Sequence, residues 1–339
     1  MTNFDAGRTA SFAPFDPTGL SRSPPNYYFH RKESAGVLRV LFIVNPIAGG
    51  GRAEKAARFL QTELKSVRGV ESDFKRTREA GHAESMALDG VRHGCTRVVA
   101  VGGDGTLHEV VNGILAASSL EARPDPLPSI GLIPCGTGND FARGMGLYST
   151  AHSALQTVLD EGDINIDVGL INDRAFVNVA GFGFDAKVAK LVTERYQGKR
   201  SALPYLVTAL RTLKSYAPTM LHIEVDGVAR EARALLGAVG NASTYGGGMK
   251  ICPKAVAHDG QLDLCLVEDV TKLETVVNLA RVFRGSHLSH PKCSYTQATR
   301  ISVSADEDVL VHADGQMLGT LPVTFSILPG ALRLAAKRK

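Results

Sequence analysis

The chain has 339 residues, of which 44% are hydrophobic and 21% are charged. This length exceeds one ordinary domain and suits two, each large enough to bury a hydrophobic core. The formal net charge of +4 comes without a dense basic stripe, so no nucleic-acid partner is expected. The five cysteines are odd in number and form no C-x-x-C pair. This argues against a disulfide framework or a zinc site and favours a reducing, cytoplasmic location.

Residues 1–36 combine prolines with Ser and Gly and show no apolar periodicity, which predicts a disordered leader. They lack the apolar core of a secretory signal, and no run in the chain approaches the roughly 20 apolar residues of a membrane span. Basic residues group at positions 195–200 and in a predicted basic tail at residues 331–339. Such groups are typical of a solvated surface, and they would also suit a peripheral contact with an anionic membrane.

Short apolar runs of buried-strand type alternate with helical periodicities between residues 37 and 160. The expected strands are 37–44, 71–76, 97–101 and 129–133, and the expected helices are 53–67, 83–91 and 107–117. Gly-rich joints connect each strand to the helix after it. This alternation predicts an α/β nucleotide domain with a doubly wound parallel sheet, whose ligand loops lie at the carboxyl ends of the strands.

The pattern changes after about residue 161, where strand-like runs are joined by turns. The expected strands are 164–171, 175–180, 220–225, 234–239, 310–313 and 321–328, with helices at 183–196, 204–215 and 271–283. Asn172-Asp173, Asp226-Gly227 and Asp314-Gly315 are typical of hairpin connections. Residues 161–330 are therefore predicted to form a β-rich, largely antiparallel and sandwich-like domain.

The strongest motif is Gly102-Gly103-Asp104-Gly105-Thr106, between an expected strand and an expected helix. Consecutive glycines allow the backbone to approach a polyphosphate, and the helix N-terminus adds partial positive charge. An acidic side chain in such a loop needs a counter-charge, which Mg²⁺ would supply. A tight turn in which Asp104 caps the helix is the simpler alternative for this motif alone.

Two further Gly-rich joints follow expected strands, at residues 45–51 and 134–140. Three such loops in one parallel sheet would lie along the same edge and form a phosphate-binding site. No segment of the chain matches G-x-x-x-x-G-K-[ST], so a P-loop lysine is absent from this pattern. Mg²⁺ would then carry more of the charge neutralisation.

These motifs, in this order, resemble those of the diacylglycerol-kinase-type lipid kinases, a family that includes bacterial diacylglycerol kinases, sphingosine kinases and ceramide kinases. The resemblance covers about residues 37 to 330 and extends to Gly181-Phe182-Gly183, Gly246-Gly247-Gly248, Asp259-Gly260 and Asp314-Gly315. G-G-D-G-T alone also occurs in NAD kinases and resembles phosphofructokinases. Its combination with G-T-G-N-D and the late Asp-Gly is specific to lipid kinases.

The resemblance implies a site for ATP, as co-substrate, at a set of matched positions. They are Asn45, Pro46, Gly49, Thr77, Gly102, Gly103, Asp104, Gly105, Thr106, Glu109, Gly136, Thr137, Gly138, Asn139 and Asp140. Asp104 and Asp140 would organise catalytic Mg²⁺, mainly through water. Val256, Asp259 and Gln261 match a second, structural Mg²⁺ site of one carboxylate and two backbone carbonyls, for which a plain turn is the alternative.

The chain departs from the family at Gln316, where relatives usually carry an acid after Asp-Gly. Transfer to a lipid hydroxyl requires a general base. Asp314 is the one carboxylate left in this motif, so it is predicted to be that base, while Gln316 positions other groups. Asp104 is the alternative base, and a hairpin turn without chemistry is the competing interpretation of Asp314-Gly315.

The predicted activity is transfer of the γ-phosphate of ATP to a lipid hydroxyl, with diacylglycerol as the first choice of acceptor. Sphingoid bases, ceramide and other lipids stay open, and an NAD kinase or a catalytically weak lipid-binding protein are alternatives of other classes. The protein would meet its lipid at the inner face of the cytoplasmic membrane, and a homodimer is left open. Apolar residues between 182 and 215 could line a lipid pocket, although most suit a core better.

Overall fold

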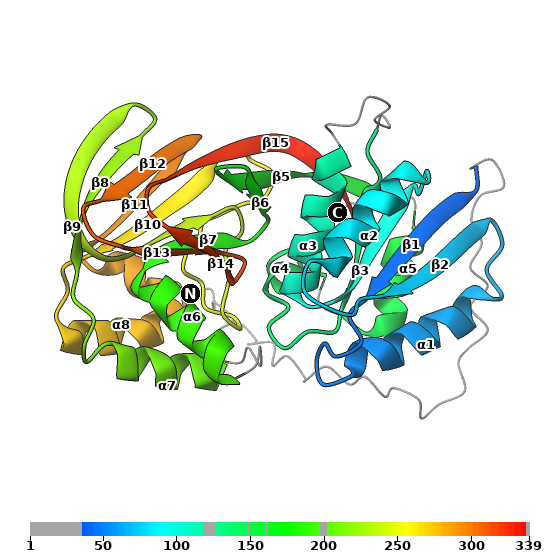
Figure 1. The fold of residues 1–339 in the computed structure, drawn as a ribbon, viewed down its shortest axis with the longest axis horizontal. Helices are drawn as coiled ribbons and strands as arrows, with labels where there is room; N and C mark the ends of the chain where they lie inside the picture. The colour runs from blue at the N-terminus through cyan, green and yellow to red at the C-terminus, as the bar shows by residue number, and fades with distance from the viewer. Residues whose placement is uncertain (1–35, 118–125, 148, 161, 197–201, 337–339) are drawn as a thin grey trace, which may run out of the picture.

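The computed structural model describes residues 36–117, 126–147, 149–160, 162–196 and 202–336. The predicted leader at residues 1–35, the basic positions 199 and 200, and the last three residues lie outside this part of the chain. Two domains lie side by side, one with a parallel sheet and one rich in antiparallel strands (Figure 1). None of the helices in the described ranges has the length and apolar character that a bilayer crossing requires.

The first domain is built on four parallel strands in the order β4-β3-β1-β2. They are β1 (Leu38–Val44), β2 (Val70–Arg76), β3 (Arg97–Gly102) and β4 (Ser129–Pro134). Its helices are α1 (Arg52–Leu64), α2 (His82–Arg92), α3 (Asp104–Ala116), α4 (Asp140–Gly144) and α5 (Ala151–Leu159). The predicted alternation of strand and helix is confirmed.

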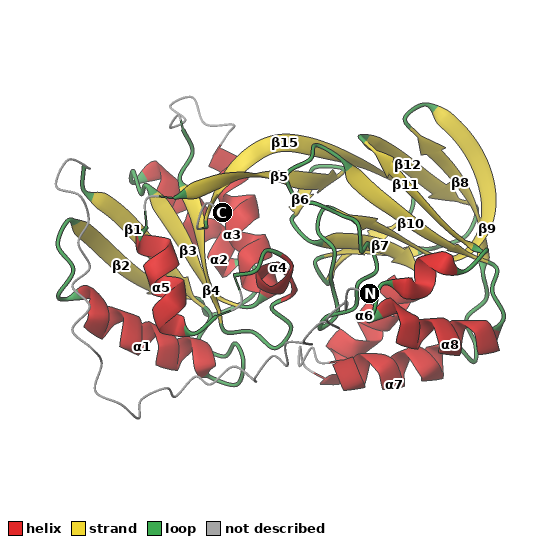
Figure 2. Cartoon of the chain, turned by 180° about the vertical axis from the view of Figure 1, so that it is seen from behind, coloured by secondary structure: helices red, strands yellow, loops and turns green. Residues whose placement is uncertain are grey.

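The buried strands of this sheet are apolar on both faces, because helices cover each face. On β1, Phe42 packs with α1 and α5, whereas the neighbouring Leu41 and Ile43 pack with α2 and α3. Figures 1 and 2 show these two helical layers from opposite sides. Successive side chains of a strand point to opposite faces, so a continuous apolar run is what a doubly covered parallel strand requires.

The second domain pairs its strands antiparallel throughout. Its strands are β5 (Asp163–Ile171), β6 (Arg174–Phe176), β7 (Val179–Gly183), β8 (Thr219–Val225), β9 (Val228–Gly240), β10 (Leu262–Glu268), β11 (Cys293–Ala298), β12 (Arg300–Ala305), β13 (Leu310–Ala313), β14 (Gln316–Thr320) and β15 (Val323–Ala335). Its helices are α6 (Phe184–Tyr196), α7 (Ala202–Thr212), α8 (Lys272–Val282) and the short 3-10 helix η2 (Ser286–Ser289). The predicted fold class, an α/β domain followed by a β-rich domain, is confirmed.

Two of the sequence-based predictions differ from the structure. The expected strand at residues 175–180 is divided between β6 and β7. The expected basic tail at 331–339 is wrong for residues 331–335, which are the end of β15. They alternate in burial because β15 pairs with β5 and meets β4 at Leu334 and Ile130. Thus β5 and β15 run together from the second domain to the parallel sheet of the first (Figure 1).

Candidate active site

Three Gly-rich loops meet at the carboxyl ends of β1, β3 and β4. A Cβ on Gly136 would overlap the Cα of Gly103, and a Cβ on Gly49 would overlap the carbonyl oxygen of Cys135. The amides of Cys135 and Gly136 both donate to the Gly102 carbonyl, at 2.7 and 3.0 Å. Only glycine allows backbones to approach this closely. These glycines are therefore required by the packing of the loops as well as by any phosphate that binds there.

Predicted nucleotide residues from three strand ends lie at this edge. The amide of Asn45 donates to the Val101 carbonyl at 3.0 Å, and the amide of Thr77 donates to the Val44 carbonyl at 2.8 Å. The Asn45 side chain also donates to Thr106 Oγ1 at 3.4 Å. The structure therefore brings these positions together, while their contact with ATP stays a prediction.

The carboxylates of Asp104 and Asp140 converge beside Gly138. A Cβ on Gly138 would lie 2.9 Å from Asp140 Oδ2 and 3.3 Å from Asp104 Oδ2. Asp104 is the first residue of α3 rather than its N-cap, and its Oδ1 accepts a hydrogen bond from the amide of Phe141 at 3.1 Å. Two carboxylates from separate loops thus lie next to each other. A role of Asp104 in helix capping would not require this arrangement.

Asp140 links the two domains. Its Oδ2 and Oδ1 accept hydrogen bonds from the amides of Gly247 and Gly248, at 2.8 and 2.7 Å. Burial, followed by the charge of Asp104, raises the pKa of Asp140 to about 7, and the two amides oppose this shift. The Gly246-Gly247-Gly248 segment of the second domain therefore completes the acidic end of the nucleotide site.

The donor atoms at this position fit Mg²⁺. Mg²⁺ prefers oxygen ligands, keeps several waters and is usually held by one or two carboxylates together with substrate phosphates. Asp104 and Asp140 supply two carboxylates without a nitrogen or sulfur ligand between them. The repulsion that raises the pKa of Asp140 is also the kind of repulsion that a bound cation would relieve.

Two arginines reinforce the loops, and sequence reasoning missed both. Arg52 donates to the carbonyl of Gly49 at 3.0 Å and to that of Gly136 at 2.7 Å, so it ties the first loop to the third. Arg143 of α4 donates to the Gly138 carbonyl at 3.3 Å. Their positions in the sequence could have identified them: Arg52 follows Gly51 by one residue, and Arg143 follows Asp140 by three. They place positive charge where the chain has no P-loop lysine.

Glu109 has a defined structural contact. Its Oε2 accepts a hydrogen bond from the amide of Ala83 at 3.1 Å. Ala83 lies in the first turn of α2, where backbone amides have no partner within the helix. Glu109 therefore satisfies the start of α2, and its predicted contact with nucleotide remains a prediction.

Asp314 and Gly315 form the two-residue turn between β13 and β14, with φ angles of 48° and 76°. The turn does not leave the carboxylate in solvent, because the Asp314 side chain is only 1% exposed. Its oxygens accept hydrogen bonds from three consecutive amides, those of Val177 at 3.0 Å, Asn178 at 2.9 Å and Val179 at 3.3 Å. The predicted hairpin turn is confirmed, and the structure adds that its first side chain is buried; the general-base role stays a prediction.

A chain of polar side chains leads from Asp314 to the first domain, and its other three members, His108, Arg174 and Glu84, were not singled out from sequence. His108 of α3 lies with Nδ1 3.1 Å from Asp314 Oδ2, and Arg174 Nε donates to His108 Nε2 at 3.3 Å. Nε2 therefore accepts and Nδ1 donates to the carboxylate. Arg174 pairs through both terminal nitrogens with Glu84, at 2.9 and 2.6 Å. His108 follows Asp104 by one helical turn, which is the signal that could have identified it.

The proposed structural metal residues lie together in an exposed turn before β10. The Val256 carbonyl accepts from the amide of His258 at 2.7 Å, and Asp259 Oδ1 accepts from the amide of Gln261 at 3.0 Å. The oxygen donors suit Mg²⁺, but these two hydrogen bonds are equally those of a plain turn. The second Mg²⁺ site therefore remains a prediction.

Most of the apolar residues considered for a lipid pocket belong to the core. Phe184, Val188 and Leu213 are buried in one cluster of the second domain. Leu206 and Leu210 of the same stretch line a hollow of about 560 Å³ between α7 and α8, together with Val276, Leu279 and Phe283. Arg281 and Arg284 also line it. This feature joins apolar and cationic groups in one surface.

Comparisons with known proteins agree with this fold and site. The diacylglycerol kinase catalytic domain family matches residues 39–171, and the YegS C-terminal NAD kinase beta sandwich-like domain matches residues 178–336. A diacylglycerol kinase of Bacillus subtilis (strain 168) is 31% identical over 85% of this chain and 92% of its own length. One of Staphylococcus haemolyticus is 30% identical over 84% of this chain and 83% of its own length.

A solved structure gives the same result in three dimensions. It is that of a candidate diacylglycerol kinase from Bacillus anthracis str. Sterne, with a TM-score of 0.76 and 26% identity. The match covers 91% of this chain and 99% of the other. The two-domain fold and the matched families are those of a lipid kinase. The chain belongs to the diacylglycerol kinase family. Among these matches, its likeness to NAD kinases is limited to the second domain, whose family is described as NAD kinase beta sandwich-like.

Proposed function

We propose that this lipid kinase transfers the γ-phosphate of ATP to the hydroxyl of diacylglycerol. The observation that carries the proposal is the convergence of Asp104 and Asp140 beside three interlocked glycine loops. The relatives at about 30% identity are named diacylglycerol kinases, which supports this acceptor over ceramide or a sphingoid base. Asp104 and Asp140 would hold Mg²⁺, which when bound would offset the negative charge of the phosphates.

The residues of the chain divide the work of phosphoryl transfer. The glycine loops present backbone amides to the phosphates, and Arg52 and Arg143 hold those loops in register. We propose that Asp104 takes the proton of the lipid hydroxyl, because Asp314 already accepts four hydrogen bonds. These four bonds engage both oxygens of the buried Asp314 carboxylate with donors of the protein itself. Asp314 would instead hold His108 and the β6–β7 segment in place.

A panel of acceptors tests the activity. Purified enzyme receives γ-labelled ATP and Mg²⁺ with diacylglycerol, ceramide or sphingosine in mixed micelles, or with NAD in solution. We expect labelled lipid product with diacylglycerol, at a kcat/KM at least about tenfold above the other lipids, and loss of activity in EDTA. Label in NAD, or preference for a different lipid, would contradict the proposed acceptor.

We propose that the enzyme meets its substrate through the α7–α8 face, which we define as Leu210, Lys272, Leu273, Val276, Val277, Arg281 and Arg284. The exposed fractions of its apolar side chains are 37% for Leu210, 75% for Leu273, 43% for Val276 and 48% for Val277. Leu279 and Val282 of α8 pack against the core of the domain. The helix has no buried residue, however, and folding alone does not explain the exposed Leu273, Val276 and Val277. Apolar residues beside cationic ones suit the surface of an anionic bilayer.

Vesicle binding tests this face. Replacing both Val276 and Val277 by Glu removes apolar contact and adds repulsion, so we expect binding to vesicles of phosphatidylcholine with 30 mol% phosphatidylglycerol to weaken about tenfold or more. Cosedimentation of the purified variants with the vesicles measures the effect. The matched control is Val228→Glu, which changes a residue 71% exposed at the β8–β9 hairpin. An equal loss of vesicle binding in the control variant would show that the α7–α8 face has no specific role in membrane binding.

A further inference from the structure

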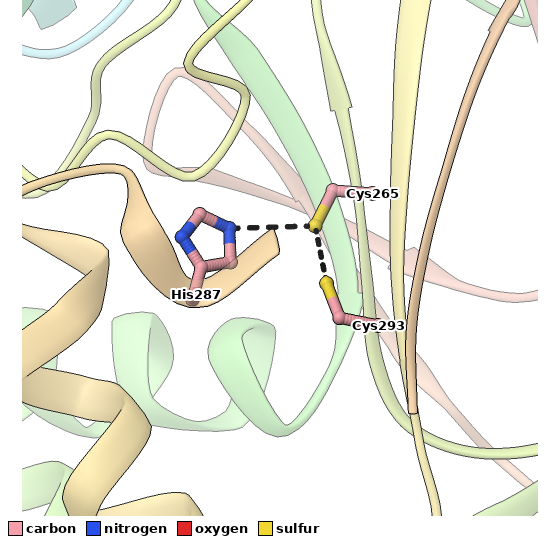
Figure 3. A group of neighbouring side chains, drawn as sticks. All are labelled: Cys265, His287 and Cys293. Atoms are coloured by element: carbon pink, nitrogen blue, oxygen red, sulfur yellow. Dashed lines mark hydrogen bonds between the residues drawn. The ribbon is translucent and has the colours of Figure 1, made fainter. Parts of the chain in front are cut away.

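Three potential metal ligands meet in the second domain, away from the nucleotide site. Cys265 lies on β10, Cys293 on the neighbouring strand β11, and His287 on η2 in the connection between them. Figure 3 shows the two thiols and the imidazole directed toward one another. The absence of a C-x-x-C pair argued against zinc in the sequence, but the chain returns these residues to one place through strand pairing.

The distances match a tetrahedral zinc site. The two sulfurs are 3.6 Å apart, and Cys265 Sγ is 3.7 Å from His287 Nε2. Bonds of about 2.3 Å to sulfur and 2.0–2.1 Å to nitrogen at tetrahedral angles separate two sulfurs by about 3.8 Å and a sulfur from a nitrogen by about 3.6 Å. All three ligand atoms lie within 4.8 Å of one another, so the third edge is also compatible with a shared ion after at most a small adjustment.

The strand register argues against a disulfide. Cys265 is paired with Tyr295, and Cys293 with Val267, so the two cysteines are diagonal neighbours on one face of the sheet. Diagonal Cα atoms are typically about 7–8 Å apart, whereas a disulfide usually requires 4.4–6.8 Å. A metal ion spans the two sulfurs without this approach.

The surroundings suit a neutral metal complex. Cys265 and His287 are buried, while Cys293 is partly exposed and leaves a route for an ion. Two thiolates offset the charge of Zn²⁺, so the complex as a whole places no net charge among buried apolar side chains. Thiolate and imidazole are ligands that favour Zn²⁺ over Mg²⁺.

We propose that Cys265, His287 and Cys293 bind one Zn²⁺, with water in the fourth position. Binding releases two thiol protons to solvent and forms two Zn–S bonds and one Zn–N bond. His287 Nε2 now lies 3.1 Å from the carbonyl oxygen of Ile251. On binding, Nε2 becomes the ligand atom, and the ring proton resides on Nδ1. The ion would join β10, β11 and η2, and so fix the connection that carries α8.

Metal titration of the purified full-length protein, reduced and freed of metal, tests the site. Co²⁺ is added first as the probe, and we expect one equivalent to give thiolate-to-metal absorption and the visible bands of a tetrahedral complex. Zn²⁺ should abolish this spectrum at one equivalent, and excess Mg²⁺ should leave it unchanged. A wild-type protein without these bands would overturn the proposal.

Variants locate the ligands. Cys265→Ser and His287→Gln should each weaken Zn²⁺ binding about 100-fold or more in competition with a chromophoric chelator, while Cys95→Ser, in the first domain, binds as the wild type does. Circular dichroism establishes whether each variant is folded. If Cys265→Ser does not fold, Cys293→Ser replaces it in the test, because Cys293 is only partly buried. Wild-type affinity in the folded ligand variants would refute the site. A disulfide between Cys265 and Cys293 that persists in reductant with excess Zn²⁺ would also refute the site; mass spectrometry would detect it as a protein two mass units lighter.

Discussion

Asp104→Asn is expected to lower kcat by about 10³-fold or more while leaving the fold intact. The substitution keeps an oxygen that can accept the hydrogen bond from the Phe141 amide, so the α3–α4 contact survives. It removes the negative charge that a magnesium ion and a lipid proton would both require, and groups that act as a unit in phosphoryl transfer lose most of the rate when one is removed.

The measurement is kcat on diacylglycerol in mixed micelles, together with the thermal midpoint Tm. Asp89→Asn is the matched control, because Asp89 is a half-exposed acid on α2 that pairs only at 3.5 Å with Arg92. The control variant should keep wild-type kcat. An Asp104→Asn enzyme that retains more than about a tenth of the wild-type kcat would remove Asp104 from both the metal site and the proton transfer.

The parallel domain was predictable because its signals are local. Strands β1, β3 and β4 are short apolar runs, and each leads into a loop that contains glycines. The helices after β1, β2 and β3 each show a helical period in the sequence. The loops between them carry the nucleotide motifs, and the geometry of parallel strands predicted that these loops meet at one edge of the sheet. The shared metal role of Asp104 and Asp140 was implied by the resemblance to lipid kinases, and the structure places the two carboxylates together.

The second domain was less predictable because its contacts depend on register. Strands β10, β11 and β12 were not expected from sequence, and Cys265 meets Cys293 only because β10 pairs antiparallel with β11. The same is true of Asp140 with the amides of Gly247 and Gly248, which lie 107 and 108 residues further along the chain. A pattern of residue types gives no signal for which distant amide will meet a carboxylate.

The chain from Glu84 to Asp314 shows this most clearly. Its four members come from α2, β6, α3 and the β13–β14 turn, and His108 lies 206 residues from its partner Asp314. The Asp-Gly pair predicted a hairpin correctly, but a hairpin motif does not reveal whether the first side chain turns inward. Because the side chain of Asp314 points inward, we expect its substitution to lower the stability of the fold more than the rate of proton transfer.

Asp314→Asn is expected to lower the free energy of unfolding by about 1–3 kcal/mol. The new amide nitrogen must lie on one side of the carboxamide. It faces either the Val177 amide and His108, or the amides of Asn178 and Val179, all of which now donate to the carboxylate. A buried donor opposite a donor is left unsatisfied. For a chain of 339 residues we expect the Tm to fall by roughly 1–4 °C.

Kinetics distinguish this structural role from the general base predicted from sequence. If Asp314 positions His108 and the β6–β7 segment, the folded variant should lose about tenfold in kcat at most, and the acidic limb of its pH–rate profile should remain. If Asp314 is the base, kcat should fall about 10²–10⁴-fold and the acidic limb should disappear, whatever the change in Tm. Gln316→Glu, at the start of β14, tests the family's usual acid beside it and is expected to preserve or raise kcat on the same lipid. A stable Asp314→Asn enzyme with no acidic limb would return the proton transfer to Asp314 and leave Asp104 with the metal alone.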